Sequence, residues 1–471
     1  MRQMKPMRLS RPRRGLRPIL LVGVLGACEA SERPITFDLV LPEDRADLEA
    51  TNNVSLVLEP DGTTFTTATD GLSFSLGIEV EPDVELRTLS IFLAQDAELL
   101  AWGRSVQFVT AGPDVSLAIL AARPGQLSTF PNPLPAADAG VLPAYAAGRG
   151  LFLLDSDGDM FVQSELDYTV FTATALADPP PAEDGDLFVA DDDTLLRVAW
   201  NGALDGRRYD PDLNTWVTLT ANDVASRSGA VPLLDRDNDR LLLHGGDGRT
   251  EVLAIPLSVP GGDEGSLRDV VDPDLRLDRV RDGAAAARVV RDDQPVGYLL
   301  FGGDSTGPAL FFQPSGSSVG PSLGPWTEAA CAQLDELDGP RLLCVGGQRD
   351  GTATADGLLV TLPEGRGPTV EVLTDLLPVP LPDPLLLTDT SALYAQGEGR
   401  LFRLAAGQPT IGTGPADGFV EVQGPALRAS GGHSVPLGTG ATFVAGGVDT
   451  DGSPVDRLQV FMPSVESTDP P

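Results

Sequence analysis

The chain has little of what marks helical, nucleic-acid-binding or membrane-spanning proteins. Segments with an apolar residue at every third or fourth position are hard to find, which argues against a helical fold. The sequence has 33 Lys and Arg against 68 Asp and Glu, a formal net charge of −35. Such a surface repels the phosphate backbone, so we expect no nucleic-acid partner. The apolar run at residues 19–27 is too short to cross about 30 Å of hydrocarbon as a permanent helix.

The first 27 residues read as an export signal. Seven basic and no acidic residues occupy positions 1–18, and a short apolar run with small residues then leads to Cys28. Leu25-Gly26-Ala27-Cys28 resembles the bacterial lipobox. That resemblance implies cleavage before Cys28 and a lipid on its thiol. Two or three acyl chains, at roughly 0.8 kcal/mol per buried CH₂, hold a protein on a membrane durably. An ordinary signal peptide with a Cys near its cleavage site is the alternative.

The mature chain is more acidic than the precursor. Removing residues 1–27 takes away seven positive charges and moves the formal charge from −35 to −42. Glu29 stands where the lipobox family places an Asp for inner-membrane retention, so the resemblance implies an outer-membrane location. Residues 28–34 would form the lipidated tether.

The rest of the chain shows short apolar runs separated by Gly, Asp and Pro, which predicts an all-β fold. Six or seven such runs between residues 35 and 122 predict a small β-sandwich of immunoglobulin-like type. The Cys–Trp–Cys pattern of true immunoglobulin domains is lacking. We expect this module to act as a spacer next to the membrane anchor.

A repeat fills residues 124–465. Seven glycines mark its copies at intervals of 44 to 57 residues: Gly158, Gly202, Gly246, Gly303, Gly347, Gly399 and Gly447. A period of this length with about four short strands per unit predicts a β-propeller of about seven blades. Closing the ring removes exposed sheet edges, so we expect one blade to combine strands from both ends of the domain.

The repeat resembles the kelch family, in which a hydrophobic strand ends in Gly-Gly and a Tyr and a Trp follow. Tyr209 and Trp216 in YDPDLNTW match the Tyr-to-Trp half, and most copies lack these two residues. Positive φ and close backbone approach explain the glycines without a ligand. The glycine pairs are Gly245-Gly246, Gly302-Gly303, Gly346-Gly347 and Gly446-Gly447.

Catalytic constellations are scarce. Some kelch-like propellers are copper radical oxidases with two His and two Tyr on the metal, one Tyr linked to a Cys. This chain has two histidines, His244 and His433, and each reads as a blade position beside a glycine pair. Neither Cys331 nor Cys344 stands in a copper-ligand context, so a copper site is not expected. A serine hydrolase needs a His base near a Ser and an orienting acid, and the GGHS segment around His433 supplies no plausible helix turn, which argues against this chemistry. Paired carboxylates carry no signal among 68 acidic residues.

Calcium is the one cofactor that the sequence leaves open. Asp155, Asp157 and Asp159 place carboxylates at alternate positions of a turn, a pattern that hard cations favour. A weaker copy of this pattern of alternate carboxylates consists of Asp235, Asp237 and Asp239. Neither loop has the Glu at the twelfth position of an EF-hand. The alternative is a pair of solvated hairpin turns, where Asp and Asn are preferred anyway.

Cys331 and Cys344 are the only cysteines beyond Cys28. They flank a segment that reads as a hairpin with its turn near Asp338-Gly339. On paired strands they would form a disulfide, which an exported location permits. Two buried thiols are the alternative, and strand register decides between them.

These features predict a non-enzymatic, lipid-anchored protein that displays a kelch-like propeller to a protein or glycan partner. A polysaccharide hydrolase or lyase with carboxylates at the propeller centre is one alternative. A structural component of a cell-envelope assembly is another.

Overall fold

The computed structural model describes residues 33–465, apart from 73, 75–77, 112–114, 135–137, 165–171, 175–184, 191–193, 211–214, 223–224, 259–265, 268, 293, 305, 314, 336–338, 365, 390–391 and 406–417. Cys28 and the predicted signal lie outside the described residues. Two short 3₁₀ helices, η1 (Ala46–Ala50) and η2 (Arg236–Asn238), are the helical elements of the described part. None of its helices is long and apolar enough to cross a membrane.

The N-terminal module consists of seven strands within residues 33–122. They are β1 (Arg33–Val40), β2 (Asn53–Glu59), β3 (Thr63–Ala68), β4 (Ile78–Val80), β5 (Thr88–Gln95), β6 (Glu98–Arg104) and β7 (Val115–Ala122). Their order is β3-β2-β5-β6-β7-β1-β4, with β1 parallel to β7. Side chains from β2, β5, β7 and β4 meet in one core, because alternate residues of each strand are apolar.

The sequence predicts a sandwich of immunoglobulin type for this module, and that arrangement is not confirmed. The seven strands form a single continuous sheet, joined where β6 pairs with β7. Gly103 makes that junction, since a Cβ there would lie 2.1 Å from the carbonyl oxygen of Leu120. A larger residue could not bring the two backbones this close.

The all-β propeller with seven blades is confirmed, since residues 126–462 form seven four-stranded antiparallel sheets in the described part of the chain. Blade 1 comprises β9 (Leu142–Ala146), β10 (Gly150–Leu154), β11 (Met160–Gln163) and β12 (Thr172–Thr174). Blade 2 comprises β13 (Gly185–Val189), β14 (Leu195–Ala199), β15 (Asp205–Asp210) and β16 (Thr215–Leu219). Blade 3 comprises β17 (Val231–Asp235), β18 (Arg240–His244), β19 (Val252–Pro256) and β20 (Val270–Asp272).

Blade 4 comprises β21 (Ala285–Arg291), β22 (Gln294–Phe301), β23 (Pro308–Gln313) and β24 (Ser317–Ser322). Blade 5 comprises β26 (Ala330–Asp335), β27 (Arg341–Val345), β30 (Gly357–Thr361) and β31 (Thr369–Leu373). Blade 6 comprises β32 (Leu385–Thr388), β33 (Ala392–Gly397), β34 (Arg400–Ala405) and β35 (Val420–Val422). A small extra sheet in blade 5 joins β25 (Trp326–Thr327), β28 (Gln348–Arg349) and β29 (Thr352–Ala353).

Blade 7 closes the ring with strands from both ends of the propeller, as the repeat predicts. Its strands are β36 (His433–Pro436), β37 (Thr442–Ala445), β38 (Arg457–Met462) and β8 (Gln126–Pro133). β8 pairs with β38 as the outermost strand. At most junctions the first strands of neighbouring blades lie against one another, including β36 against β9, so the first strands form the inner ring of the propeller.

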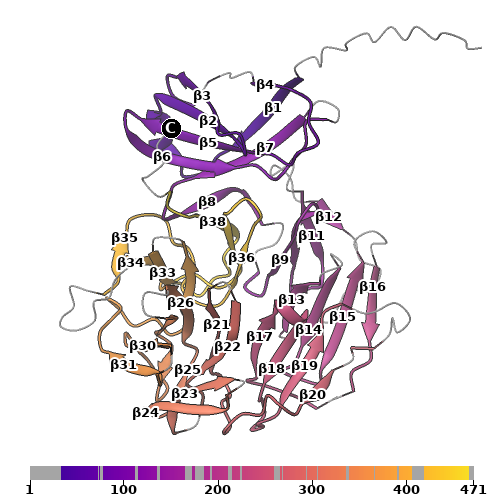
Figure 1. Cartoon of the computed structure of the whole chain (residues 1–471), viewed down its shortest axis with the longest axis vertical. Coiled ribbons are helices and arrows are strands. Elements are labelled where there is room, and N and C mark those ends of the chain that lie inside the picture. The colour runs from indigo at the N-terminus through magenta and orange to yellow at the C-terminus, as the bar shows by residue number, and fades with distance from the viewer. Residues whose placement is uncertain are drawn as a thin grey trace, which may run out of the picture.

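The module sits directly on blade 7 (Figure 1). Both faces of β7 are buried: Leu117, Ile119 and Ala121 enter the core of the module, while Ala118, Leu120 and Ala122 enter a second core. That second core contains Phe130 of β8, Phe443 of β37 and Leu151 of β10, all propeller residues. The module is therefore packed against the propeller through an apolar core.

Polar contacts reinforce this junction. Arg123, between β7 and β8, donates to Asp44 at 3.1 Å and pairs with Asp47. The indole nitrogen of Trp102 donates to the Pro463 carbonyl at 2.8 Å. The expected spacer is thus fixed to the propeller by both kinds of contact.

Candidate binding face and the mouth of the inner ring

The glycine pairs lie between the second and third strands of their blades. The second glycine of each pair has a φ between +80° and +106°. These second glycines are Gly246, Gly303, Gly347 and Gly447. A Cβ at these positions would lie 2.4 to 2.7 Å from atoms just ahead of the first strand of the blade. Positive φ and a close approach therefore both require glycine, as the sequence predicts.

Buried arginine side chains and an indole donate hydrogen bonds to these turns, and the sequence patterns above do not predict them. Arg227, which is 1% exposed, donates to the Gly245 carbonyl at 3.1 Å. Arg281, fully buried, donates to the Gly302 carbonyl at 3.0 Å. In blade 5 the indole nitrogen of Trp326 donates to the Gly346 carbonyl at 2.7 Å.

These three donors stand four positions ahead of the first strand of their blade. The two arginines share an Arg-x-Gly-Ala segment, at 227–230 and 281–284. That short repeat is a signal from which the arginines could have been found. Each donor fixes the first glycine carbonyl, so it sets the conformation of the turn that begins there.

We name the propeller surface formed by the turns between second and third strands the turn face. Its described residues are 155–159, 200–204, 245–251, 302–304, 306–307, 346–356, 398–399 and 446–456. These segments have two basic residues, Arg249 and Arg349, and twelve acidic ones. The acidic residues are Asp155, Asp157, Asp159, Asp247, Glu251, Asp304, Asp350, Asp356, Glu398, Asp449, Asp451 and Asp456.

Two of these carboxyl groups are held in unfavourable surroundings. Burial raises the pKa of Asp155, and the charges of Asp159, Asp157 and Asp138 raise it further, against one backbone hydrogen bond. Burial and the charge of Asp282 likewise raise the pKa of Asp304. Burial first, and neighbouring carboxylates second, thus disfavour the ionised form of these two groups.

The mouth of the inner ring opens at the same end, because the first strand of each blade starts opposite the end of the second. Asp186 of β13 in blade 2 and His433 of β36 in blade 7 meet there, with Oδ1 and Nδ1 3.3 Å apart. Burial raises the pKa of Asp186, and the nearby His433 opposes that shift. The fold joins this pair across blade 1, between positions far apart in the sequence.

The calcium prediction has no support from geometry. Among the described residues, no group of three or more His, Cys, Asp or Glu side chains is placed to hold a metal. Asp155 instead accepts the backbone N–H of Asp159 at 2.7 Å. The calcium site stays an untested prediction.

The second acidic loop makes its own protein contacts. The Asp235 carboxylate accepts from Arg240 and Asn238, each at 2.8 Å. Asp237 pairs with Arg288, and Asp239 accepts the backbone N–H of Ser258 at 3.0 Å. These contacts hold the loop as an ordered turn between β17 and β18.

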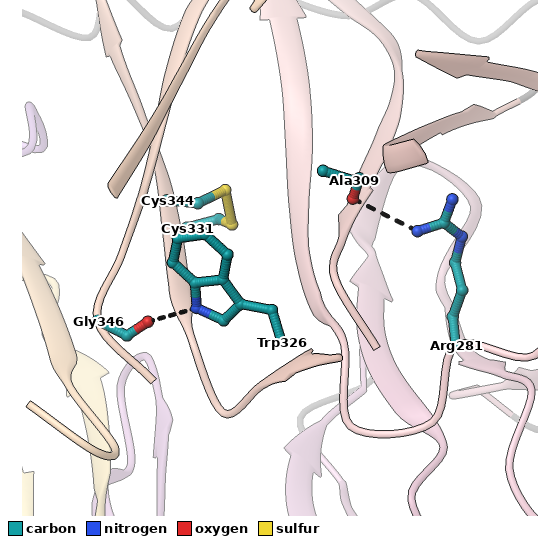
Figure 2. Close-up of a disulfide and its surroundings, with 6 residues drawn as sticks. All are labelled: Arg281, Ala309, Trp326, Cys331, Cys344 and Gly346. Atoms are coloured by element: carbon teal, nitrogen blue, oxygen red, sulfur yellow. Dashed lines mark hydrogen bonds between the residues drawn. A yellow bond between two sulfur atoms is a disulfide. The ribbon is translucent and has the colours of Figure 1, made fainter. Parts of the chain in front are cut away.

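Cys331 and Cys344 form a disulfide, the first of the two arrangements that the sequence leaves open. They stand directly opposite each other on β26 and β27. Figure 2 shows the Trp326 indole beside the disulfide while its nitrogen bonds the Gly346 carbonyl. The bridge therefore belongs to the core of blade 5.

His244, the other histidine, is fully buried at the end of β18. Its Nδ1 lies 3.1 Å from the Val231 carbonyl and its Nε2 lies 2.9 Å from the Gln313 side-chain oxygen. Burial lowers its pKa to about 4, although these two hydrogen bonds oppose the shift. It is a buried blade residue, hydrogen-bonded within blade 3 and to Gln313 of β23 in blade 4.

Comparison with known proteins adds little sequence information. No family model matches the chain, and no curated protein matches it. Similar solved structures include the β-propeller domain of Cps50 (Swd1) from Myceliophteria thermophila, a chain of the Mitotic Checkpoint Complex, and the WD40 repeats of RRP9. Their identities are 10%, 10% and 9%, and their TM-scores are 0.42, 0.42 and 0.43. The matches cover 70%, 73% and 71% of this chain and 98%, 95% and 96% of those chains.

Proposed function

We propose that this chain is an exported, lipid-anchored binding protein whose kelch-like propeller holds a basic segment of a protein partner at the turn face. The observation that carries the proposal is the collection of twelve acidic residues at one end of a closed ring. Two of these carboxyl groups, Asp155 and Asp304, are destabilised as anions by burial and by neighbouring carboxylates.

A cationic partner would relieve that repulsion. Charge complementarity raises the association rate and selects among partners, and its contribution weakens as salt screens it. The glycine turns and their arginine donors support such a surface, because they hold the acidic side chains on short, fixed loops.

The anchor is the part of the proposal that rests on the lipobox resemblance. Metabolic labelling with an alkyne fatty acid should mark the wild-type chain and leave Cys28→Ser unlabelled. The variant should also move from the membrane fraction to the soluble exported fraction. A Cys28→Ser chain that keeps the label would contradict the proposed lipid site.

The turn face is tested by co-purification from the native envelope. Asp304→Asn with Asp451→Asn should lower recovery of a specific partner at least tenfold. Glu364→Gln with Glu371→Gln removes two exposed charges on β31 and the turn before it, so it serves as the matched control and should leave recovery unchanged. Equal loss with both pairs would point to net charge alone and overturn the proposed site. A partner recovered at fixed stoichiometry would place the chain in an envelope assembly.

The second candidate is a polysaccharide hydrolase or lyase, favoured by the Asp186–His433 pair. A carboxyl group with a raised pKa can stay protonated and donate its proton to a leaving group. Turnover of an exported polysaccharide that Asp186→Asn abolishes, with partner recovery unaffected, would favour this candidate over the first.

A further inference from the structure

A groove of about 950 Å³ lies between the N-terminal module and the end of the propeller. The floor of the groove is the face of β2, β5 and β6 that points away from the core of the module. Its wall on the propeller side consists of Gly438 and residues 463–465. The volume is at the upper end of the range for small-molecule sites, about 300 to 1,000 Å³. The groove is separate from the turn face, because residues 437–441 connect β36 to β37 at the opposite end of blade 7.

Two aromatic rings form part of this floor. Phe92 of β5 and Trp102 of β6 are directly opposite each other in the strand register and both line the groove. Their ring centroids lie 6.4 Å apart and their planes differ by 14°. The bond from the Trp102 nitrogen to the Pro463 carbonyl fixes the indole in place. The pair is therefore a preorganised apolar platform.

Hydrogen-bonding side chains surround the platform. Arg104 and Glu59 form an ion pair, and the Thr88 hydroxyl donates to Glu59 at 3.1 Å. Ser90 and Gln107 line the same groove. These groups supply donors and acceptors on a surface whose one cation and one anion cancel. The groove is thus locally neutral in a strongly acidic chain.

The chemistry favours a sugar chain over a peptide. One face of a pyranose ring carries C–H groups with partial positive charge, which pack on the negative face of an aromatic ring. Its hydroxyl groups can bond the surrounding donors and acceptors. A peptide that adds a strand needs a free sheet edge, whereas β2 and β5 are each paired on both sides.

We infer that this groove binds a segment of a neutral polysaccharide, with sugar rings against Phe92 and Trp102 and hydroxyl groups on the Arg104–Glu59 side. The module would then be a second binding site beside the propeller. The inference does not depend on the turn face or on the lipid anchor.

Native gels containing soluble β-1,4-glucan, β-1,3-glucan, xylan or mannan test this directly on the mature chain. At least one of the four should retard the wild-type protein. Phe92→Ala should weaken that retardation at least tenfold, whereas Phe188→Ala, which removes a partly buried ring from blade 2, should not change it. Failure of all four polysaccharides to retard the wild-type chain, or undiminished retardation of Phe92→Ala, would overturn the inference.

A second pair of variants guards against misfolding. Thr64 is exposed at the groove and Thr63, next to it, is exposed on the opposite face of β3. Thr64→Lys should block retardation, and Thr63→Lys should not. If both variants bind like the wild type, the inference fails.

Tryptophan fluorescence gives an independent readout. Trp200, Trp216 and Trp326 are buried, while Trp102 is partly exposed. The polysaccharide that retards the chain should therefore protect mainly Trp102 from quenching by iodide. Unchanged quenching in its presence would contradict binding on the aromatic pair.

Discussion

At the scale of single residues, each glycine turn combines two requirements that one position must meet. Gly303 has φ of +106°, and a Cβ there would lie 2.7 Å from Cα of Arg281. The Arg281 side chain then returns to the Gly302 carbonyl and forms an ion pair with Asp278 at 2.8 Å. Glycine lets the arginine approach, and the arginine supplies donors to the turn.

Gly303→Ala should therefore destabilise the chain by about 3 kcal/mol or more, because it adds a backbone clash to a strained φ. Gly316→Ala is the matched control: its φ is +66° and no atom lies within 4 Å of the added Cβ. It should cost about 1 kcal/mol. Urea denaturation measures both. Equal costs would show that close approach is not what selects the glycine.

Because the pKa of His244 is lowered by burial, we expect the folded chain to lose stability on mild acidification. Its pKa is lowered to about 4 in the folded chain from 6.5, so protonation favours the unfolded state. The stability due to neutral His244 is complete above pH 6.5 and is lost as pH falls toward 4. At pH 5 the loss is about 2 kcal/mol.

Urea midpoints at pH 7.5 and pH 5 for the wild type and His244→Leu isolate this contribution, since carboxylates titrate in both. The wild type should lose more stability than the variant between these two values. A parallel loss in the two proteins would mean that His244 does not titrate in this range.

The paired glycines could be predicted from the sequence, whereas the burial of the arginines that bond them could not. Paired glycines repeat visibly, whereas Arg227 and Arg281 read as surface charges because a lone arginine is rarely buried. The Asp186–His433 pair is beyond sequence reasoning for another reason. Its members stand on strands of different blades, and only closure of the ring brings them together.

At the scale of elements, the disulfide fixes the first two strands of blade 5. The two cysteines are 13 positions apart and form a closed loop of a size for which a bridge contributes about 3 kcal/mol. Cys344 is fully buried, so an unbridged pair would leave a thiol in the core.

Reduction should lower the urea midpoint of the wild type by an amount equivalent to about 2 to 3 kcal/mol. The Cys331→Ala, Cys344→Ala double variant should start lower and show no response to reductant. Alkylation followed by mass measurement should find these thiols protected in the unreduced chain. Two free thiols after unfolding without reductant would contradict the disulfide.

The blades could be predicted because each one repeats a local pattern of strands and turns. The continuous sheet of the module could not, since it depends on the backbone approach of Gly103 to Leu120, a contact that no periodicity reports. The disulfide could be predicted in part. The sequence indicates the hairpin that contains Cys331 and Cys344, but only the strand register shows that the two residues lie opposite each other.

At the scale of the whole molecule, β7 couples the module to the propeller. Successive residues of this strand enter two different cores, and the second core is shared with blades 1 and 7. Separating the two parts would expose Leu120, Phe130 and Phe443 to water. At about 25 cal/mol per Å² of apolar surface, that separation is strongly unfavourable.

The chain should therefore unfold in one transition, and a change in either part should shift all of it. Leu120→Ala, at the junction, should cost about 2 to 5 kcal/mol, as should Leu342→Ala in the core of blade 5. Calorimetry, with fluorescence of buried Trp326 and partly exposed Trp102 as local probes, measures whether the transitions coincide. If the module were an independent spacer, Leu120→Ala would separate an early transition of the module from an unshifted transition of the propeller. Coincident shifts in both variants would instead mean that whatever binds the groove or the turn face stabilises the whole molecule.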